Sequence, residues 1–298
     1  MGLAIRRRAL SRASCGGRGS VRPFTDPCPR RPMRDPAGSA MPNEPITRRE
    51  ALRRTTLGAF VIATGGCLGS TEPSGAGGGD GRLTARVTSP TQTTAPGLYP
   101  LGLGGSRDGF LYVPTSYRSD TPAPIALLLH GAGHDATEMV DPIRPLADTL
   151  GLLLLAPDSR GGTWDAIRGS FSDDVQFIDR AFTHAFARVR VDANRVRIVG
   201  FSDGGSYSLS LGMINGDLFS RVVAFSPGFI VPRAPTGKPK VFITHGTRDA
   251  VLPIDQASRV IVPQLKSAGY DVEYREFDGG HGVTDALLGE AMTWTTAA

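Results

Sequence analysis

Cysteine is scarce in this chain of 298 residues, and its positions are more informative than its number. The three cysteines are Cys15, Cys28 and Cys67, so none follows residue 67. The sequence after that point cannot hold an internal disulfide, a thiolate nucleophile or a zinc ion bound by cysteine. Any chemistry in that part of the chain must use other side chains.

Metal and phosphate motifs are also lacking. The five histidines are not grouped with aspartates as a metal-ligand set, so we predict no metal and no other cofactor. Three consecutive glycines stand at 77–79, but no strand and helix signals follow them, as a phosphate-binding loop requires. A hydrolytic metal site and a nucleotide-phosphate site are therefore both disfavoured.

Excess positive charge is confined to the beginning of the chain. The net charge is +5 at pH 7, yet residues 1–67 hold 13 arginines and 4 acidic residues, a net +9. Residues 68–298 hold 20 basic and 24 acidic residues, a net −4. The basic character belongs to the leader, so we predict no nucleic-acid partner for the folded part.

The leader resembles an export signal. Residues 47–54 read TRREALRR, like a twin-arginine signal, and the apolar run LGAFVIA at 57–63 is too short to span a bilayer permanently. We expect export by a twin-arginine-type route to the periplasm, the exterior or the cell envelope. The alternative is a disordered basic arm. Both Met1 and Met41 fit as the start, since Met41 precedes a signal of ordinary length.

Cys67 ends this leader and leaves a lipid anchor open. Gly65 and Gly66 precede it as in lipoprotein signals, although Thr64 stands where an aliphatic residue is typical. We divide the chain into a leader at 1–67, a flexible linker at 68–82 and one folded domain at 83–298. The sequence does not indicate an oligomeric state.

The domain alternates strand and helix signals. Helical spacing of apolar residues predicts helices at 173–188 and 256–268. Short β-branched or leucine-rich runs predict strands at 111–114, 125–129, 152–156, 196–200, 222–225, 241–244 and 272–276. This alternation predicts an α/β fold with a mainly parallel sheet and helices on both faces.

A serine stands where a strand signal gives way to a helix signal. The sequence GFSDG at 200–204 places small residues on both sides of Ser202, which is typical of a sharp nucleophile turn. Asp249 follows the strand signal at 241–244, and His281 lies in a glycine loop after the strand signal at 272–276. Serine, aspartate, then histidine is the chain order of a known hydrolase triad.

These elements together resemble a known family. From about residue 96 to the end, the chain is similar to the phospholipase/carboxylesterase group of α/β-hydrolases and to esterases of the polyhydroxybutyrate-depolymerase type. The resemblance rests on residues 107–114, the His130-Gly131 loop, residues 173–175, the serine turn and the Asp249 and His281 loops. It implies an α/β-hydrolase fold. The serine at 202 excludes dienelactone hydrolases, which need a cysteine there.

The predicted catalytic set is Ser202 as nucleophile, His281 as general base and Asp249 as the acid that orients it. Asp278 is the competing acid, only three residues before His281. Backbone N–H groups of Ala132 and Asp203 are the predicted oxyanion hole, with Gly133 as the fallback donor. We predict that His130 and His245 have structural roles.

The substrate can be bounded only loosely. Gly131, Gly133 and Trp164 are predicted to bind it, and the short segment at 226–239 leaves no room for a large cap domain. We expect a serine carboxylesterase (EC 3.1.1.-) that cleaves small-molecule esters of small or medium acyl chains. A thioesterase or peptidase of the same fold is an alternative, as is a non-catalytic ligand- or partner-binding protein on the cell envelope.

Overall fold

The computed structural model describes residues 79–297, and every structural statement below concerns those residues. The predicted leader, its export and lipid-anchor signals, and the linker up to residue 78 lie outside them. At the end of the predicted linker the chain already packs on the domain, because Leu83 is buried and the Arg82 guanidinium donates to the carbonyl of Ile214.

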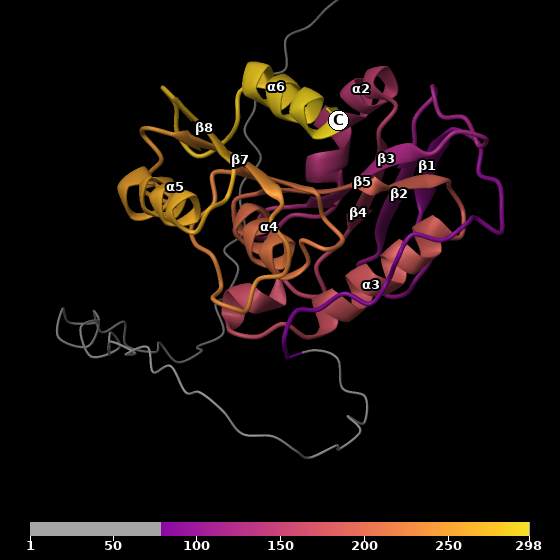
Figure 1. The fold of residues 1–298 in the computed structure, drawn as a ribbon, viewed down its shortest axis with the longest axis horizontal. Coiled ribbons are helices and arrows are strands. Elements are labelled where there is room, and N and C mark those ends of the chain that lie inside the picture. Colours follow the sequence, from indigo (N-terminus) through magenta and orange to yellow (C-terminus); the bar gives the residue numbers. More distant parts are fainter. Residues whose placement is uncertain (1–78, 298) are drawn as a thin grey trace, which may run out of the picture. The chain divides into compact units, whose positions relative to one another are not determined.

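An eight-stranded sheet forms the centre of the domain, in the order β1-β2-β4-β3-β5-β6-β7-β8 (Figure 1). β2 pairs antiparallel with both β1 and β4, and all further pairs from β4 to β8 are parallel. The strands are β1 (Gly97–Pro100), β2 (Gly109–Val113), β3 (Ala123–Leu129), β4 (Leu153–Pro157), β5 (Val191–Phe201), β6 (Arg221–Phe225), β7 (Lys240–Gly246) and β8 (Val272–Phe277). The predicted mainly parallel sheet is confirmed.

Helices cover both faces of this sheet (Figure 1). They are α2 (Thr137–Leu150), α3 (Asp173–Phe186), α4 (Asp203–Ile214), α5 (Ser258–Ser267) and α6 (Asp285–Thr296), with short 3₁₀ helices η1 (Asp165–Arg168) and η2 (Ile254–Gln256). Successive strand residues point to opposite faces. In β3, Leu127 packs with α3, α4 and α5 in one apolar cluster, whereas Leu128 packs with α2 and α6 in the other.

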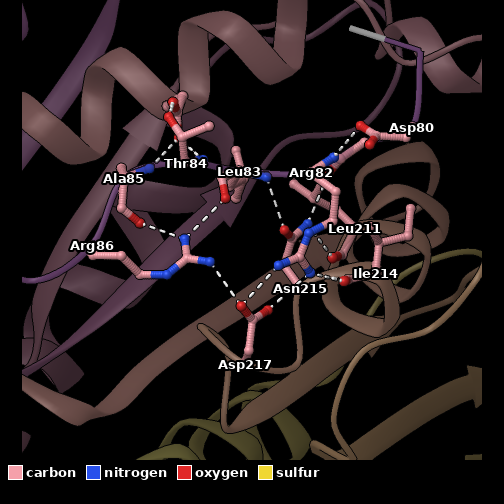
Figure 2. A network of polar contacts seen from close by, with 12 residues as sticks. Asp80, Arg82, Leu83, Thr84, Ala85, Arg86, Leu211, Ile214, Asn215 and Asp217 are labelled. Carbon is pink, nitrogen blue, oxygen red and sulfur yellow. Dashed lines mark hydrogen bonds and ion pairs between the residues drawn. The ribbon is translucent and has the colours of Figure 1, made fainter. Parts of the chain in front are cut away.

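The first described residues are fastened to the end of α4 (Figure 2). The backbone N–H of Leu83 donates to Asn215 Oδ1 at 2.9 Å, and Asn215 Nδ2 donates to the carbonyl of Gly81 at 2.9 Å. Arg82 and Arg86 both form ion pairs with the carboxylate of Asp217. Residues 81–86 are therefore held against the domain by the buried Asn215 amide and by exposed ion pairs with Asp217.

The fold brings the predicted site residues to one edge of the sheet. Ser202 follows β5, Asp249 follows β7, His281 follows β8 and Ala132 follows β3. Parallel strands end at the same edge, where ligands bind in open α/β sheets. No helix interrupts residues 226–239 between β6 and β7, so no cap covers this edge from that connection. Within residues 79–297, no helix is long and apolar enough to cross a membrane.

Candidate active site

Ser202 occupies a strained turn between β5 and α4. Its φ of 57° and ψ of −118° lie in a region that L-residues rarely adopt. The turn is fixed by the Ser202 N–H, which donates to the carbonyl of Phe225 at 2.9 Å. A side chain at Gly204 would place its Cβ 2.1 Å from the carbonyl oxygen of Leu129. Glycine is therefore required at position 204, two residues after the serine.

The side chain of Ser202 meets the predicted histidine. Ser202 Oγ lies 2.8 Å from His281 Nε2, and His281 Nδ1 lies 2.6 Å from Asp249 Oδ2. Ser202 is 9% exposed and the His281 side chain 16%, so both can be reached from the surface. The structure thus joins three side chains from loops after three strands, in the sequence of contacts that activates a serine.

The carboxylate of Asp249 is surrounded by hydrogen-bond donors. Oδ1 accepts from the N–H groups of Val251 and Leu252, each at 2.8 Å, while Oδ2 faces His281 and, at 3.1 Å, His245 Nε2. Burial alone would raise the pKa of Asp249, but the hydrogen bonds from His281, Leu252 and Val251 outweigh it and hold the pKa below its ordinary value. Asp249 is therefore an anion at neutral pH.

His245 is a fully buried second histidine against this carboxylate. Its Nε2 lies 2.8 Å from the carbonyl of Leu252, and its Nδ1 lies 2.7 Å from Ser258 Oγ. Burial lowers the pKa of His245, so the ring is neutral. With Nε2 facing two acceptors, the proton belongs on Nε2 and the Ser258 hydroxyl donates to Nδ1. The sequence did not indicate this contact with Asp249.

Asp278, the competing acid, lies elsewhere. Its carboxylate forms an exposed ion pair with Arg248, and its side chain is 78% exposed. The proximity of Asp278 to His281 in sequence does not bring the two side chains together, because the loop turns the carboxylate outward. Asp249 is the acid in contact with the histidine.

The two N–H groups predicted to form the oxyanion hole, those of Ala132 and Asp203, lack acceptors among residues 79–297. Asp203 opens α4, so its N–H has no partner within the helix. Among residues 79–297, the N–H of Ala132 also has no protein acceptor. Gly133, the fallback, donates its N–H to the carbonyl of Gly162 at 2.7 Å. Gly133 is thus engaged, whereas Ala132 and Asp203 are the pair that remains available.

Trp164 does not line the site, which corrects its predicted role in substrate binding. Its side chain is fully buried, its ring packs between His130 and Tyr207, and Nε1 donates to the carbonyl of His130 at 2.8 Å. The loop position of Trp164 suggested exposure, but the large apolar ring is covered by α4. Trp164 instead supports the strand end that leads into Gly131, whose own N–H donates to Glu138 at 2.6 Å.

His130 braces the same loop. Its Nε2 accepts from the N–H of Ser159 at 3.0 Å, and its Nδ1 therefore carries the proton and donates to the carbonyl of Gly131 at 2.7 Å. Burial lowers its pKa, which keeps the ring neutral. His134 lies four residues after His130, a spacing that two metal-binding histidines can have. Both ring nitrogens of His130 are already hydrogen-bonded to protein groups, so they are not free to bind a metal. Within residues 79–297 no group of three or more His, Cys, Asp and Glu residues could hold a metal ion.

Sequence comparison finds a known family that is similar to the second half of this chain. Residues 155–297 match the phospholipase/carboxylesterase family. NocK of Nocardia uniformis subsp. tsuyamanensis, named as an esterase, is 31% identical over 146 residues, covering 45% of this chain and 42% of NocK. A poly(3-hydroxybutyrate) depolymerase of Ralstonia pickettii is 28% identical over 142 residues, covering 40% of this chain and 28% of the relative. The chain spans less than half the length of these relatives.

Solved structures confirm the fold. The esterase PE8 superposes with a TM-score of 0.52 at 20% identity, covering 62% of this chain and 95% of PE8. The fluorophosphonate-binding serine hydrolase F of Staphylococcus aureus gives a TM-score of 0.52 at 18% identity, covering 63% of this chain and 92% of that one. These similarities show that the chain has an α/β-hydrolase fold and that residues 155–297 are similar to the phospholipase/carboxylesterase family.

Proposed function

We propose that this protein is a serine hydrolase that cleaves carboxylic esters of small or medium acyl chains through an acyl-enzyme. The observation that carries the proposal is the continuous contact from Ser202 Oγ through His281 to Asp249. The names of the relatives, which include esterases and a bifunctional acetylxylan esterase/xylanase of Neocallimastix patriciarum, favour an ester over an amide or thioester.

The first half-reaction acylates Ser202. Ser202 Oγ attacks the ester carbonyl carbon while its proton passes to His281 Nε2. The oxygen of the tetrahedral intermediate is stabilised by the N–H groups of Ala132 and Asp203, the second of which lies at the positive end of α4. The carbon–oxygen bond to the alcohol then breaks, and His281 returns the proton to the departing oxygen.

The second half-reaction frees the enzyme. Water attacks the acyl carbon and gives its proton to His281, and the carboxylic acid leaves as Ser202 Oγ recovers that proton. Throughout, Asp249 keeps the His281 proton on Nδ1 and stabilises the imidazolium that forms twice per turnover. This role requires an ionised carboxylate, in agreement with the lowered pKa of Asp249.

Hydrolysis of p-nitrophenyl esters from acetate to decanoate by the full chain tests the proposal. Ser202→Ala should lose at least about 10³-fold in kcat, because it removes the nucleophile. Ser106→Ala, which changes an exposed serine in a loop, serves as the control and should match the unmutated protein. Equal activity of all three proteins would refute Ser202 as the nucleophile. A folded protein without activity on any ester would favour the non-catalytic alternative.

A further inference from the structure

An apolar cavity of about 220 Å³ lies between the first turns of α2 and the start of α6. Its walls are mainly apolar side chains from four elements and the loop before α6: Met139, Ile143, Phe201, Phe225, Val283 and Leu288. The helices α2 and α6 pack against each other over the same face of the sheet (Figure 1). None of these wall residues was predicted as substrate-binding, because they come from separate elements with no shared motif.

The cavity adjoins the histidine side of the site. Phe201 directly precedes Ser202, and its ring centroid lies 5.1 Å from that of His281. Gly282 and Val283, which line the cavity, directly follow His281. The carbonyl of Phe225, another wall residue, accepts a hydrogen bond from the backbone N–H of Ser202. The cavity therefore lies beside the imidazole of His281.

Proton transfer determines which part of an ester lies beside this imidazole. His281 Nε2 must protonate the oxygen of the departing alcohol, so this oxygen lies against the imidazole in the reacting complex. The carbon chain of the alcohol starts at that oxygen, on the side where Phe201 and Val283 stand. We propose that the cavity binds the alcohol moiety of the ester, and this inference rests on the proposed esterase function.

Charge and size restrict that alcohol. The carboxylates of Glu138 and Asp285 also line the cavity, so an anionic alcohol would be repelled. Glu138 Oε2 accepts a hydrogen bond from the N–H of Gly131, which fixes this side chain beside the loop after β3. The volume is below the roughly 300–1,000 Å³ of pockets for drug-sized ligands. The cavity therefore takes an apolar alcohol of a few carbon atoms that carries no negative charge, such as hexanol or benzyl alcohol.

Two ester series separate alcohol binding from acyl binding. One compares ethyl acetate with hexyl acetate, and the other compares ethyl acetate with ethyl hexanoate. Val283→Phe fills the cavity and should lower kcat/KM for hexyl acetate relative to ethyl acetate by about 10-fold or more, since one methylene in an apolar pocket is already worth about 10–200-fold. The ratio for the acyl series should stay unchanged. Met139→Ala, which enlarges the opposite wall, should raise the hexyl preference.

Val260→Phe is the matched control, because Val260 is exposed on α5, away from the cavity. It should change neither ratio. A Val283→Phe protein that changes the acyl ratio instead would overturn the proposal and make the cavity an acyl pocket. Active cavity variants with both ratios unchanged would show that no part of the substrate enters it.

Direct binding keeps this inference separate from the esterase proposal. Hexan-1-ol should give saturation-transfer NMR signals with the Ser202→Ala protein, lose them when Val283→Phe is added, and keep them when Val260→Phe is added. If no ester is hydrolysed, the proposed function fails, but this binding pattern would still support an alcohol-binding cavity. Absence of binding, or equal binding in both double variants, would overturn it.

Discussion

Replacing His245 with leucine should remove one of the four donors around the Asp249 carboxylate while keeping a side chain of similar bulk. His245 Nε2 lies 3.1 Å from Asp249 Oδ2 and shares its proton with the carbonyl of Leu252 at 2.8 Å. The remaining donors are His281 and the N–H groups of Val251 and Leu252. The variant therefore keeps the carboxylate in place but leaves it with one hydrogen-bond donor fewer.

The size of the effect follows from this shared geometry. A hydrogen bond to a charged group contributes about 1.5–3 kcal/mol, and a shared, longer bond belongs at the low end. About 1.5 kcal/mol corresponds to roughly a 10-fold loss of kcat/KM if the oriented carboxylate is needed in the transition state. The pKa of Asp249 should also rise toward its ordinary value, because a donor that favours the anion is gone.

The pH dependence of stability provides a second readout. A carboxylate with a lowered pKa stabilises the folded state above its unfolded pKa, about 3.9, and this stability is lost as the pH falls through the folded value. His245→Leu should therefore be less stable than the unmutated protein at pH 7, by a margin that shrinks below about pH 4. Urea unfolding at several pH values measures this margin.

Ser258→Ala is the matched control for this variant. It removes the hydroxyl on His245 Nδ1 but leaves the two acceptors that hold the proton on Nε2. Its kcat/KM should fall less than that of His245→Leu. If His245→Leu folds and keeps kcat/KM for p-nitrophenyl acetate within about twofold, less than about 0.5 kcal/mol, the histidine does not help to position the carboxylate.

Three further predictions concern the support of the site and the fold. Gly204→Ala should lower the free energy of unfolding in urea by about 1–3 kcal/mol or more, because the new Cβ would lie 2.1 Å from a backbone oxygen. Gly289→Ala in α6 should be neutral or stabilising, because the space around Gly289 is open. Equal effects of the two substitutions would contradict the turn geometry. Asn215→Ala should lower the free energy of unfolding by about 1–3 kcal/mol, because it leaves the buried N–H of Leu83 and carbonyl of Gly81 without their partner (Figure 2). Asp217→Ala should lower it by at most about 1 kcal/mol, because its ion pairs are exposed. The reverse order of the two effects would be inconsistent with this account. Burial raises the pKa of Asp174 from 3.8 to about 6, so its ionisation lowers stability as the pH rises between those values. Asp174→Asn should therefore gain up to about 3 kcal/mol relative to the unmutated protein from pH 4 to pH 6.5, and a gain as the pH falls would refute the sign.

Much of the fold could be predicted because its central strands, such as β3, β4 and β6, are buried on both faces. The helix predicted at 173–188 is α3 (Asp173–Phe186), and the one predicted at 256–268 is η2 plus α5. By contrast, α2 carries Pro142 and Pro145 inside the helix, which disguises its apolar spacing. β1 is a short, largely exposed edge strand with no alternating pattern. Local sequence holds little signal for either.

The site could be predicted as far as local turns define it. The glycines around Ser202 are needed for that turn, so the motif is visible in the sequence. The burial of Trp164 depends on α4, and the contact of His245 with Asp249 depends on how the loop after β7 turns back. The cavity between α2 and α6 depends on helix packing over the sheet. Such long-range arrangements leave no mark at a single position.

The central claim is that Ser202 is an activated nucleophile, and covalent labelling with a fluorophosphonate tests it most directly. The full chain should gain the mass of one phosphonyl group, located on the peptide that contains Ser202, and Ser202→Ala should gain none. Ser106→Ala should label like the unmutated protein. A folded protein that stays unlabelled, or that carries the label on another serine, would contradict the account.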